Sequence, residues 1–418
     1  MYPCGSFGAG CARKRHLQII SPRNIQLDLS ICCKSTRDRA KYFQNIPVSY
    51  PTAINQHAGK RHKVFQSGIL VNLALFIISI VIAVLMGEMT LRLIGRGPLY
   101  VSPERDRFWK YDALLGWSHL PGQEGIFETA QFRTTVKINQ KGLRDRDHSY
   151  KRTFDAQRIL IVGDSFAWGY GVEETQRFSQ DLERSMNVEV INAGVSGYST
   201  DQELLWLKNE GIKYDPDLVI LVFAGNDIGD NHQQLVNTIY YKPQFVIEDG
   251  HLVLTNYPVP KNSSQGKFMY YLSQRSALFY FLVQRYFDLR SVYSKFIANP
   301  RAPISSTTAI STKKESFKLT TTLIHEIYHV AESTGAKLMI VTTDRWWNWP
   351  SSESYQDFIE VLHSEGFSVL DVESMRGFDP ERMLIPNDGH WSPDGHKFVA
   401  TKVREFIEAN QLLNRPQN

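Results

Sequence analysis

Five short, continuous apolar runs constrain the fold more than any other feature of this 418-residue chain. The runs lie at Ile159–Val162, Val188–Ile191, Leu218–Phe223, Leu338–Val341 and Phe367–Leu370. Runs without polar alternation are typical of parallel strands that are buried on both faces of a sheet. Helical patterns separate the runs, at about 176–186, 200–212, 315–334 and 354–364, and a last one extends from 395 to about 410. This alternation predicts an α/β fold, a three-layer α/β/α sandwich around a five-stranded parallel sheet.

Four short polar blocks stand where such a sheet places its active site, beyond the carboxyl ends of its strands. They are Gly163-Asp164-Ser165, the stretch NAGVSGYST at 192–200, Gly225-Asn226-Asp227 and the stretch DGHWSPDGH at 388–396. A serine on a tight turn after a buried strand exposes its hydroxyl at the rim of the sheet. The blocks therefore predict that Ser165 lies in a polar site at this edge.

The residue types in these blocks fit nucleophilic catalysis. A serine nucleophile needs a base to accept its proton, and the base needs a carboxylate to hold its tautomer. Ser165 is the candidate nucleophile, His390 the base and Asp388 its orienting acid. The backbone N–H groups of Ser165 and Gly197 and the side-chain amide of Asn226 are the candidate donors of an oxyanion hole.

The four blocks, in this order, resemble the SGNH (GDSL) hydrolase superfamily. The resemblance extends from Arg158 to about residue 410. It implies a flavodoxin-like sheet, hydrolysis of esters, and Ser165, Gly197, Asn226 and His390 as the four residues that give the superfamily its name. One feature departs from the superfamily pattern, in which the acid usually stands three residues before the histidine, because that position here is Asn387. The two-residue spacing of Asp388 and His390 is also seen in the related alginate O-acetyltransferases, so it raises the weight of acyl transfer.

Other residues near the blocks receive structural or open assignments. Asp164 and Asp227 stand in tight turns, where an aspartate side chain bonds to nearby backbone N–H groups. His396, on the first turn of the last helix, is assigned to capping or packing. Three tryptophans follow the fourth strand, and sugar binding and simple packing are equally good interpretations of them. They are Trp346, Trp347 and Trp349.

An uncharged apolar run from Ile69 to Met86 predicts a membrane-spanning helix. At 1.5 Å per residue it spans about 27 Å, close to the hydrocarbon thickness of a bilayer. Lys60, Arg61 and Lys63 precede the run, and this positive flank favours a cytoplasmic N-terminus with the rest of the chain outside. A cleaved signal peptide is the alternative, although the run is long and no clear cleavage site follows it. We assign residues 64–95 to the anchor.

Residues 1–63 are predicted to be a basic, mostly disordered leader on the cytoplasmic side. They hold eleven Lys and Arg against two Asp, whereas the whole chain has a net charge of +4, so the remaining chain is mildly acidic. This distribution gives no basic face for nucleic acid. All four cysteines also lie in the leader, at Cys4, Cys11, Cys32 and Cys33, without the spacing of a zinc site.

Two further segments complete the predicted organisation. Residues 97–157 contain short alternating runs and are expected to add a few small strands to the catalytic domain at 158–418. An insertion at 231–313 interrupts the strand–helix rhythm, with a hairpin predicted around Asp249-Gly250. The aromatic, helical stretch MYYLSQRSALFYFLVQRYF within it is predicted to pack over the core as a cap, with a second membrane contact as the alternative.

A competing motif, His325-Glu326-Ile327-Tyr328-His329, matches the H-E-x-x-H signature of zinc proteases. The helical pattern places Leu323, Ile327 and Val330 on the apolar stripe and the histidines roughly opposite, toward solvent. A metalloprotease that uses His325, Glu326 and His329 is therefore a minor hypothesis.

The sequence thus predicts a single-pass membrane protein whose SGNH-type domain lies outside the cytoplasmic membrane. The expected reaction is hydrolysis of an O-acyl ester, with O-acetyl as the first candidate, through a serine mechanism that needs no metal or cofactor. An exported or envelope polysaccharide is the expected acyl-bearing partner, by location alone. The alternatives are a polysaccharide O-acyltransferase that uses the same triad and a carbohydrate-binding module without turnover.

Overall fold

The computed structural model describes residues 58–95, 107–152, 156–236, 240–273, 275–283, 285–286, 306–344 and 353–413. The chain divides into two units, residues 1–73 and residues 74–418. The second unit contains every element described below except the first part of helix α1. Most of the predicted leader, including all four cysteines, lies outside the described residues, as do Trp346, Trp347 and Trp349.

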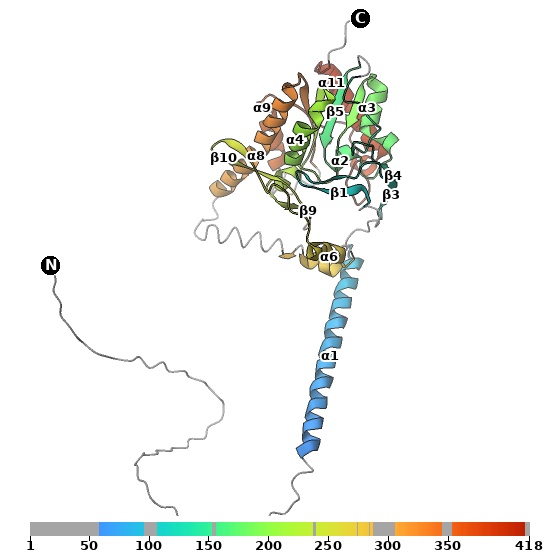
Figure 1. Ribbon diagram of the computed structural model, residues 1–418, viewed down its shortest axis with the longest axis vertical. Helices are drawn as coiled ribbons and strands as arrows, with labels where there is room; N and C mark the ends of the chain where they lie inside the picture. The colour runs from blue at the N-terminus through green and yellow to red at the C-terminus, as the bar shows by residue number, and fades with distance from the viewer. Residues whose placement is uncertain are drawn as a thin grey trace, which may run out of the picture. The chain divides into compact units, whose positions relative to one another are not determined.

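A five-stranded parallel sheet forms the centre of the fold, as predicted (Figure 1). Its strands are β5 (Arg158–Gly163), β6 (Glu189–Asn192), β7 (Leu218–Ala224), β12 (Lys337–Thr343) and β13 (Ser368–Asp371). They lie in the order β13-β12-β7-β5-β6, the doubly wound order of flavodoxin-like proteins. The chain runs from β5 to β6 on one side and returns to β7 on the other, so the carboxyl ends of β5 and β7 border the crevice where this fold binds its ligands.

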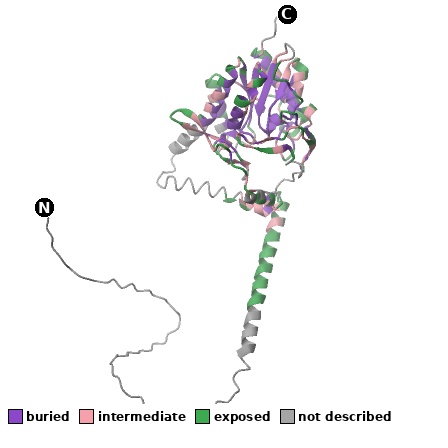
Figure 2. Cartoon of the chain, viewed as in Figure 1, coloured by how far each residue is buried: buried purple, intermediate pink, exposed green. Residues whose placement is uncertain are grey.

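Helices cover both faces of the sheet. α3 (Phe178–Met186) and α11 (Pro393–Ala409) pack on one face, and α4 (Thr200–Asn209), α8 (Ser306–Glu332) and α9 (Glu353–Ser364) on the other. Figure 2 shows the sheet as the buried centre of this sandwich. The three layers confirm the predicted α/β/α architecture.

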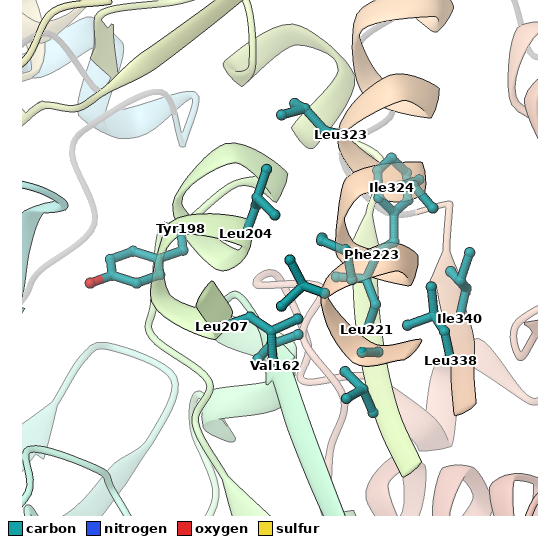
Figure 3. Close-up of a cluster of buried hydrophobic side chains, with 14 of the residues drawn as sticks. Val162, Tyr198, Leu204, Leu207, Leu221, Phe223, Leu323, Ile324, Leu338 and Ile340 are labelled. Carbon is teal, nitrogen blue, oxygen red and sulfur yellow. The ribbon is translucent and has the colours of Figure 1, made fainter. Parts of the chain in front are cut away.

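The two faces of the sheet have separate hydrophobic cores because successive strand residues point in opposite directions. In β5, Ile159 and Ile161 face α3 and α11, whereas Leu160 and Val162 face α4 and α8. Figure 3 shows the second of these cores, in which side chains from α4 and α8, such as Leu204 and Ile324, lie in one cluster with side chains of the strands. Every residue of β5 and β7 is buried, which explains why their sequences show no polar alternation.

Among the helices of the sandwich, α4 and α8 differ most from their predicted boundaries. The helix predicted at 200–212 ends at Asn209, and Gly211–Tyr214 form a separate 3-10 turn, η3. A Cβ at Gly211 would lie 2.8 Å from Leu207 Cδ1, so the chain turns tightly against α4 there. α8 begins at Ser306, before the predicted start at 315 and inside the predicted insertion. The remaining short helices are α2 (Ser165–Trp168), η2 (Glu174–Gln176), α5 (Asp227–Asp230) and α10 (Pro380–Met383).

Two small antiparallel hairpins precede the main sheet. β1 (Trp109–Asp112) pairs with β2 (Gly116–His119), and β3 (Glu124–Glu128) pairs with β4 (Arg133–Lys137). The buried guanidinium of Arg144 then donates hydrogen bonds to the carbonyl oxygens of Trp168, Gly169 and Val172. Since these carbonyls belong to the loop after Ser165, Arg144 fastens the hairpin region to the candidate site.

The insertion contains the predicted hairpin. β10 (Gln244–Glu248) and β11 (His251–Thr255) pair across a two-residue turn in which Asp249 and Gly250 have φ angles of 50° and 82°. Such angles belong to the tight hairpin turn that favours Asp-Gly. Two shorter strands, β8 (Leu235–Val236) and β9 (Tyr240–Tyr241), precede it.

The prediction that the aromatic stretch caps the core is wrong for its described residues. It forms α6 (Ser264–Ser273) and a second helical stretch at 277–283, and none of its described side chains joins the hydrophobic clusters on the sheet. Its Tyr271 and Leu282 side chains are instead exposed. The reason is a hydrogen-bonding partner distant in sequence, because the second helical stretch is held by Glu88 of α1.

The predicted apolar helix is present as α1 (Ala58–Leu93), which begins before the predicted boundary at 64. Its stretch Ile69–Leu93 is long and apolar enough to cross a membrane and is not buried by the described protein. A membrane anchor and a signal sequence both have these properties.

Candidate active site

Ser165 stands at the first residue of α2, directly after strand β5. The Asp164 carboxylate accepts a hydrogen bond of 2.9 Å from the backbone N–H of Phe166 and so caps this short helix. The prediction that Asp164 bonds to nearby backbone is thereby confirmed. The arrangement fixes the turn that presents the Ser165 hydroxyl at the carboxyl end of the sheet.

His390 and Asp388 reach Ser165 from the loop before α11. His390 Nε2 lies 2.8 Å from Ser165 Oγ, and His390 Nδ1 lies 2.5 Å from Asp388 Oδ1. Asn387, at the superfamily's usual acid position, is exposed. The structure therefore brings the three sequence-predicted side chains into one hydrogen-bonded chain, with Asp388 and not Asn387 beside the imidazole.

The surroundings of His390 favour a neutral imidazole. Burial lowers the pKa of His390 below its usual value, and the Asp388 carboxylate beside Nδ1 opposes this shift. The Tyr170 ring stacks on the imidazole with centroids 4.1 Å apart and planes 22° apart, and the Phe166 ring packs at 5.1 Å. Tyr170 was missed at the sequence level, although it follows Ser165 closely in the motif GDSFAWGY.

The candidate oxyanion donors come from the loops after β6 and β7. Gly197 has a φ angle of 81°, which favours glycine, and Trp117 packs against this loop, where its Nε1 donates to the Ser196 carbonyl oxygen at 3.3 Å. Asn226 Nδ2 donates to Asp230 Oδ2 at 2.9 Å, which leaves its second N–H to point elsewhere. The backbone N–H of Ser165 also acts on the Asp164 carboxyl group and lowers its pKa, against the larger effect of burial.

An aromatic cleft adjoins these groups. Its walls are Phe108, Trp109, Phe127, Trp168 and Ser196, and they leave no space for a water molecule. Ser196 precedes Gly197, and the Phe127 ring lies 5.3 Å from the Tyr170 ring that covers His390. The cleft therefore lies beside the site and admits no acyl group without movement of its walls.

A cluster of buried acids lies behind Ser165, and sequence reasoning missed it. Burial raises the pKa of Asp164 to about 7 and those of Glu203 and Asp227 well above their usual values. Asp227 accepts a hydrogen bond from the Thr200 hydroxyl at 3.0 Å, not from adjacent backbone as we predicted. Within the described residues, Glu203 has no hydrogen-bond partner for either carboxyl oxygen.

The remaining candidates lie away from this site. His396 is buried in α11, accepts a hydrogen bond from the Phe178 backbone N–H and stacks on its ring, which confirms a packing role. His325 and His329 of the H-E-x-x-H motif are largely exposed and face Glu365 and Glu332. Among the residues that the structure describes, no three His, Cys, Asp or Glu side chains are arranged to hold a metal ion.

Sequence comparison defines the class of protein. A profile of the GDSL-like lipase/acylhydrolase family matches residues 161–398, more than half of the chain. The chain belongs to this family and is a hydrolase that acts on ester bonds. No curated protein matches the sequence.

Solved structures to which this chain is similar include TesA, at 14% identity, a TM-score of 0.35 and coverage of 62% of this chain and 100% of that one. The psychrotrophic esterase EstA from Pseudoalteromonas sp. has 12% identity, a TM-score of 0.35 and coverage of 61% and 98%. A two-domain esterase active on acetylated mannans, CEX, has 13% identity, a TM-score of 0.33 and coverage of 63% and 51%. The family assignment itself rests on the profile match and agrees with the sheet order described above.

Proposed function

We propose that the protein is a membrane-anchored serine esterase that removes an O-acyl group, first of all O-acetyl, from an envelope or exported carbohydrate. The observation that carries this proposal is the hydrogen-bonded chain from Ser165 Oγ through His390 to Asp388. An ordered chain of this kind is what a serine needs to become a nucleophile near neutral pH.

The proposed reaction has two halves. His390 Nε2 accepts the hydroxyl proton while Ser165 Oγ attacks the ester carbonyl carbon, and Asp388 stabilises the imidazolium through Nδ1–H. The tetrahedral intermediate collapses when His390 returns the proton to the leaving alcohol, which leaves an acyl group on Ser165. A water molecule, deprotonated by His390, then attacks the acyl carbon and releases the carboxylic acid and free Ser165.

The oxyanion of each tetrahedral intermediate is assigned to the N–H groups of Ser165 and Gly197 and the amide of Asn226. Preorganised donors of this kind each contribute about 3–4 kcal/mol to catalysis. The hydrogen bond from Asn226 to Asp230 supports the assignment, because it fixes the amide that would face the substrate.

The membrane-spanning character of α1 supports a carbohydrate substrate. The apolar helix α1 and its positive N-terminal flank favour an anchored domain outside the cytoplasm, where acylated polysaccharides are found. The second candidate is an O-acyltransferase, in which a sugar hydroxyl replaces water in the second half-reaction, and the Asp388–His390 spacing favours it.

The test uses the full chain purified in detergent, with p-nitrophenyl acetate as substrate. Ser165→Ala is expected to lower kcat by at least about 10³-fold, because the nucleophile is lost while binding remains. Ser364→Ala is the matched control, since this exposed serine of α9 lies outside the site, and its activity is expected to equal that of the wild type.

Two further measurements separate the alternatives. Activity that persists in the presence of EDTA and in the His325→Ala variant supports the serine mechanism. Activity that is lost with EDTA or in His325→Ala, but persists in Ser165→Ala, would contradict the serine mechanism. Acetate release from an O-acetylated polysaccharide identifies an esterase. Faster loss of the acyl group when a sugar acceptor is added, with the acyl group recovered on that sugar, identifies the transferase.

A further inference from the structure

The end of the apolar helix α1 is joined to the insertion by a compact set of hydrogen bonds. The Glu88 carboxylate accepts bonds of 2.8–2.9 Å from the Ser276 hydroxyl and the backbone N–H groups of Ala277 and Leu278. Arg92 bonds to Glu88 at 2.7 Å and donates to the Arg275 carbonyl oxygen at 2.6 Å. The chain at 275–278 is thus fixed to one level of α1.

That level is where the apolar run ends. The run from Ile69 contains no charge before Glu88, and its length of about 27 Å to Met86 matches the hydrocarbon core of a bilayer. If α1 spans a membrane, Glu88 and the chain attached to it lie at the boundary between hydrocarbon and headgroups. A Cβ at Gly87 would lie 3.5 Å from Leu278 Cδ2, so the attached chain also packs directly on the helix at this level.

The attached segment, residues 264–286, exposes apolar and aromatic side chains. Those more than a third exposed are Phe268, Met269, Tyr271, Tyr280, Leu282 and Tyr286, with exposed fractions from 37% to 59%. Two consecutive short helices with so many exposed rings are unusual on a water-facing surface, whereas tyrosines are enriched where a bilayer meets water.

The charge of this region also favours contact with the surface of a bilayer. Residues 251–286 include Lys261, Lys267, Arg275 and Arg285 but no Asp or Glu. The Arg275 guanidinium carbon lies 3.9 Å from the centroid of the Tyr271 ring, so an aromatic ring and a positive charge lie side by side on this surface. Helices that lie on membranes combine buried apolar side chains with basic residues that attract anionic lipids.

We propose that residues 264–286 lie in the headgroup interface of the bilayer, on the side of the catalytic domain, with their exposed aromatic side chains in an anionic lipid surface. This inference rests on the proposed membrane anchoring by α1 and not on the esterase chemistry. It assigns to the aromatic part of the insertion a role in lipid contact in place of the predicted cap over the core.

The test measures the depth of single spin labels in the full chain. The four leader cysteines are replaced by serine, and one cysteine is introduced by Phe268→Cys, Leu282→Cys, Ile77→Cys or Glu360→Cys. Each protein is reconstituted into phosphatidylcholine vesicles that contain phosphatidylglycerol. Collision with oxygen, which enters lipid, is then compared with collision with a water-soluble nickel chelate. Ile77 reports on α1, and the exposed Glu360 of α9 is the aqueous control.

The labels at 268 and 282 are expected to lie about 5–10 Å into the boundary between headgroups and acyl chains, with the Ile77 label deeper and the Glu360 label in water. Labels at 268 and 282 that match the Glu360 label, while the Ile77 label is in lipid, overturn the inference and leave the anchor intact. An Ile77 label in water refutes the anchor and with it the inference. Labels at 268 and 282 shielded from both reagents show a protein contact and also overturn the inference.

Discussion

Asp388 contacts His390 because the backbone between them takes an unusual course. Asn387 and Gly389 have φ angles of 59° and 98°, in the left-handed region where Asn and Gly are the residues most easily accommodated. The resulting turn directs the Asp388 carboxylate back to His390 Nδ1 and leaves Asn387 exposed. A two-residue spacing therefore supplies the contact for which the superfamily usually uses a three-residue spacing.

This geometry predicts the effects of exchanging the two residues. Asp388→Asn is expected to lower kcat by about 10³–10⁴-fold, because an amide neither holds the required tautomer nor stabilises the imidazolium. Asn387→Gly, which keeps the left-handed conformation, should leave kcat unchanged. The double variant Asn387→Asp with Asp388→Asn should remain as inactive as Asp388→Asn, measured on p-nitrophenyl acetate. Recovery of activity in the double variant would show that position 387 supplies the acid.

At the scale of elements, the loop after β6 is held against the loop that bears Ser165. A Cβ at Gly194 would lie 2.4 Å from the Trp168 backbone nitrogen and 2.6 Å from the Ala167 carbonyl carbon. The Asn192 side chain reinforces this contact, since Nδ2 donates to the Ala167 carbonyl oxygen at 2.7 Å. The position of Gly197 relative to Ser165 therefore depends on a close approach of two backbones.

Gly194→Ala is expected to force these loops apart, because backbone atoms at 2.4 Å cannot be relieved by a side-chain rotation. We expect a loss of kcat/KM of tenfold or more, about 1.4 kcal/mol or more of transition-state stabilisation, and a lower Tm. Gly229→Ala is the matched control, since a Cβ there meets nothing within 4 Å. Kinetics and thermal unfolding of both variants check this prediction, and a Gly194→Ala enzyme with normal kinetics would contradict it.

The sequence predicts those elements whose burial is visible in their own residue types. β5 and β7 are buried on both faces, so their side chains are apolar apart from Arg158 at the start of β5, and Ser165 and Asn226 stand two residues after the strands end. The environment of residues 264–286 depends instead on Glu88, nearly two hundred positions away. The stacking of Tyr170 on His390 likewise depends on tertiary packing, which leaves no periodic signal in the sequence.

For the whole molecule, the buried acids behind Ser165 set a pH dependence of stability. Lys242 bonds to Asp201, and its positive charge opposes the rise in the pKa of both Asp201 and Glu203. Burial and the nearby carboxyls raise the pKa of Glu203, so the folded protein keeps a proton that the unfolded chain loses above about pH 4.5. Stability from this group is therefore complete below that pH and is lost as the pH rises toward the folded pKa.

Buried histidines act in the opposite direction. Burial lowers the pKa of His119 to about 4 and that of His396 to about 3. The unfolded chain protonates both below about pH 6.5 while the folded protein does not, so their contribution is lost as the pH falls through this range. Between about pH 4.5 and 6.5, a rise in pH therefore lowers the stability contributed by the buried acids and raises that contributed by the two histidines. Of these two contributions, only that of the acids still changes above about pH 6.5.

Glu203→Gln is therefore expected to flatten the alkaline side of the stability profile. A buried carboxyl with a raised pKa costs about 1.4 kcal/mol of unfolding free energy per pH unit, and glutamine of nearly the same shape has no proton to lose. Thermal unfolding of the full chain in detergent at pH 5.5, 7 and 8.5 should show a smaller fall in Tm for Glu203→Gln than for the wild type. The exposed Glu360→Gln makes the same chemical change on the surface of α9 and should follow the wild type. Parallel profiles for all three proteins would mean that Glu203 is ionised in the folded state, and that the buried cluster is neutralised in another way.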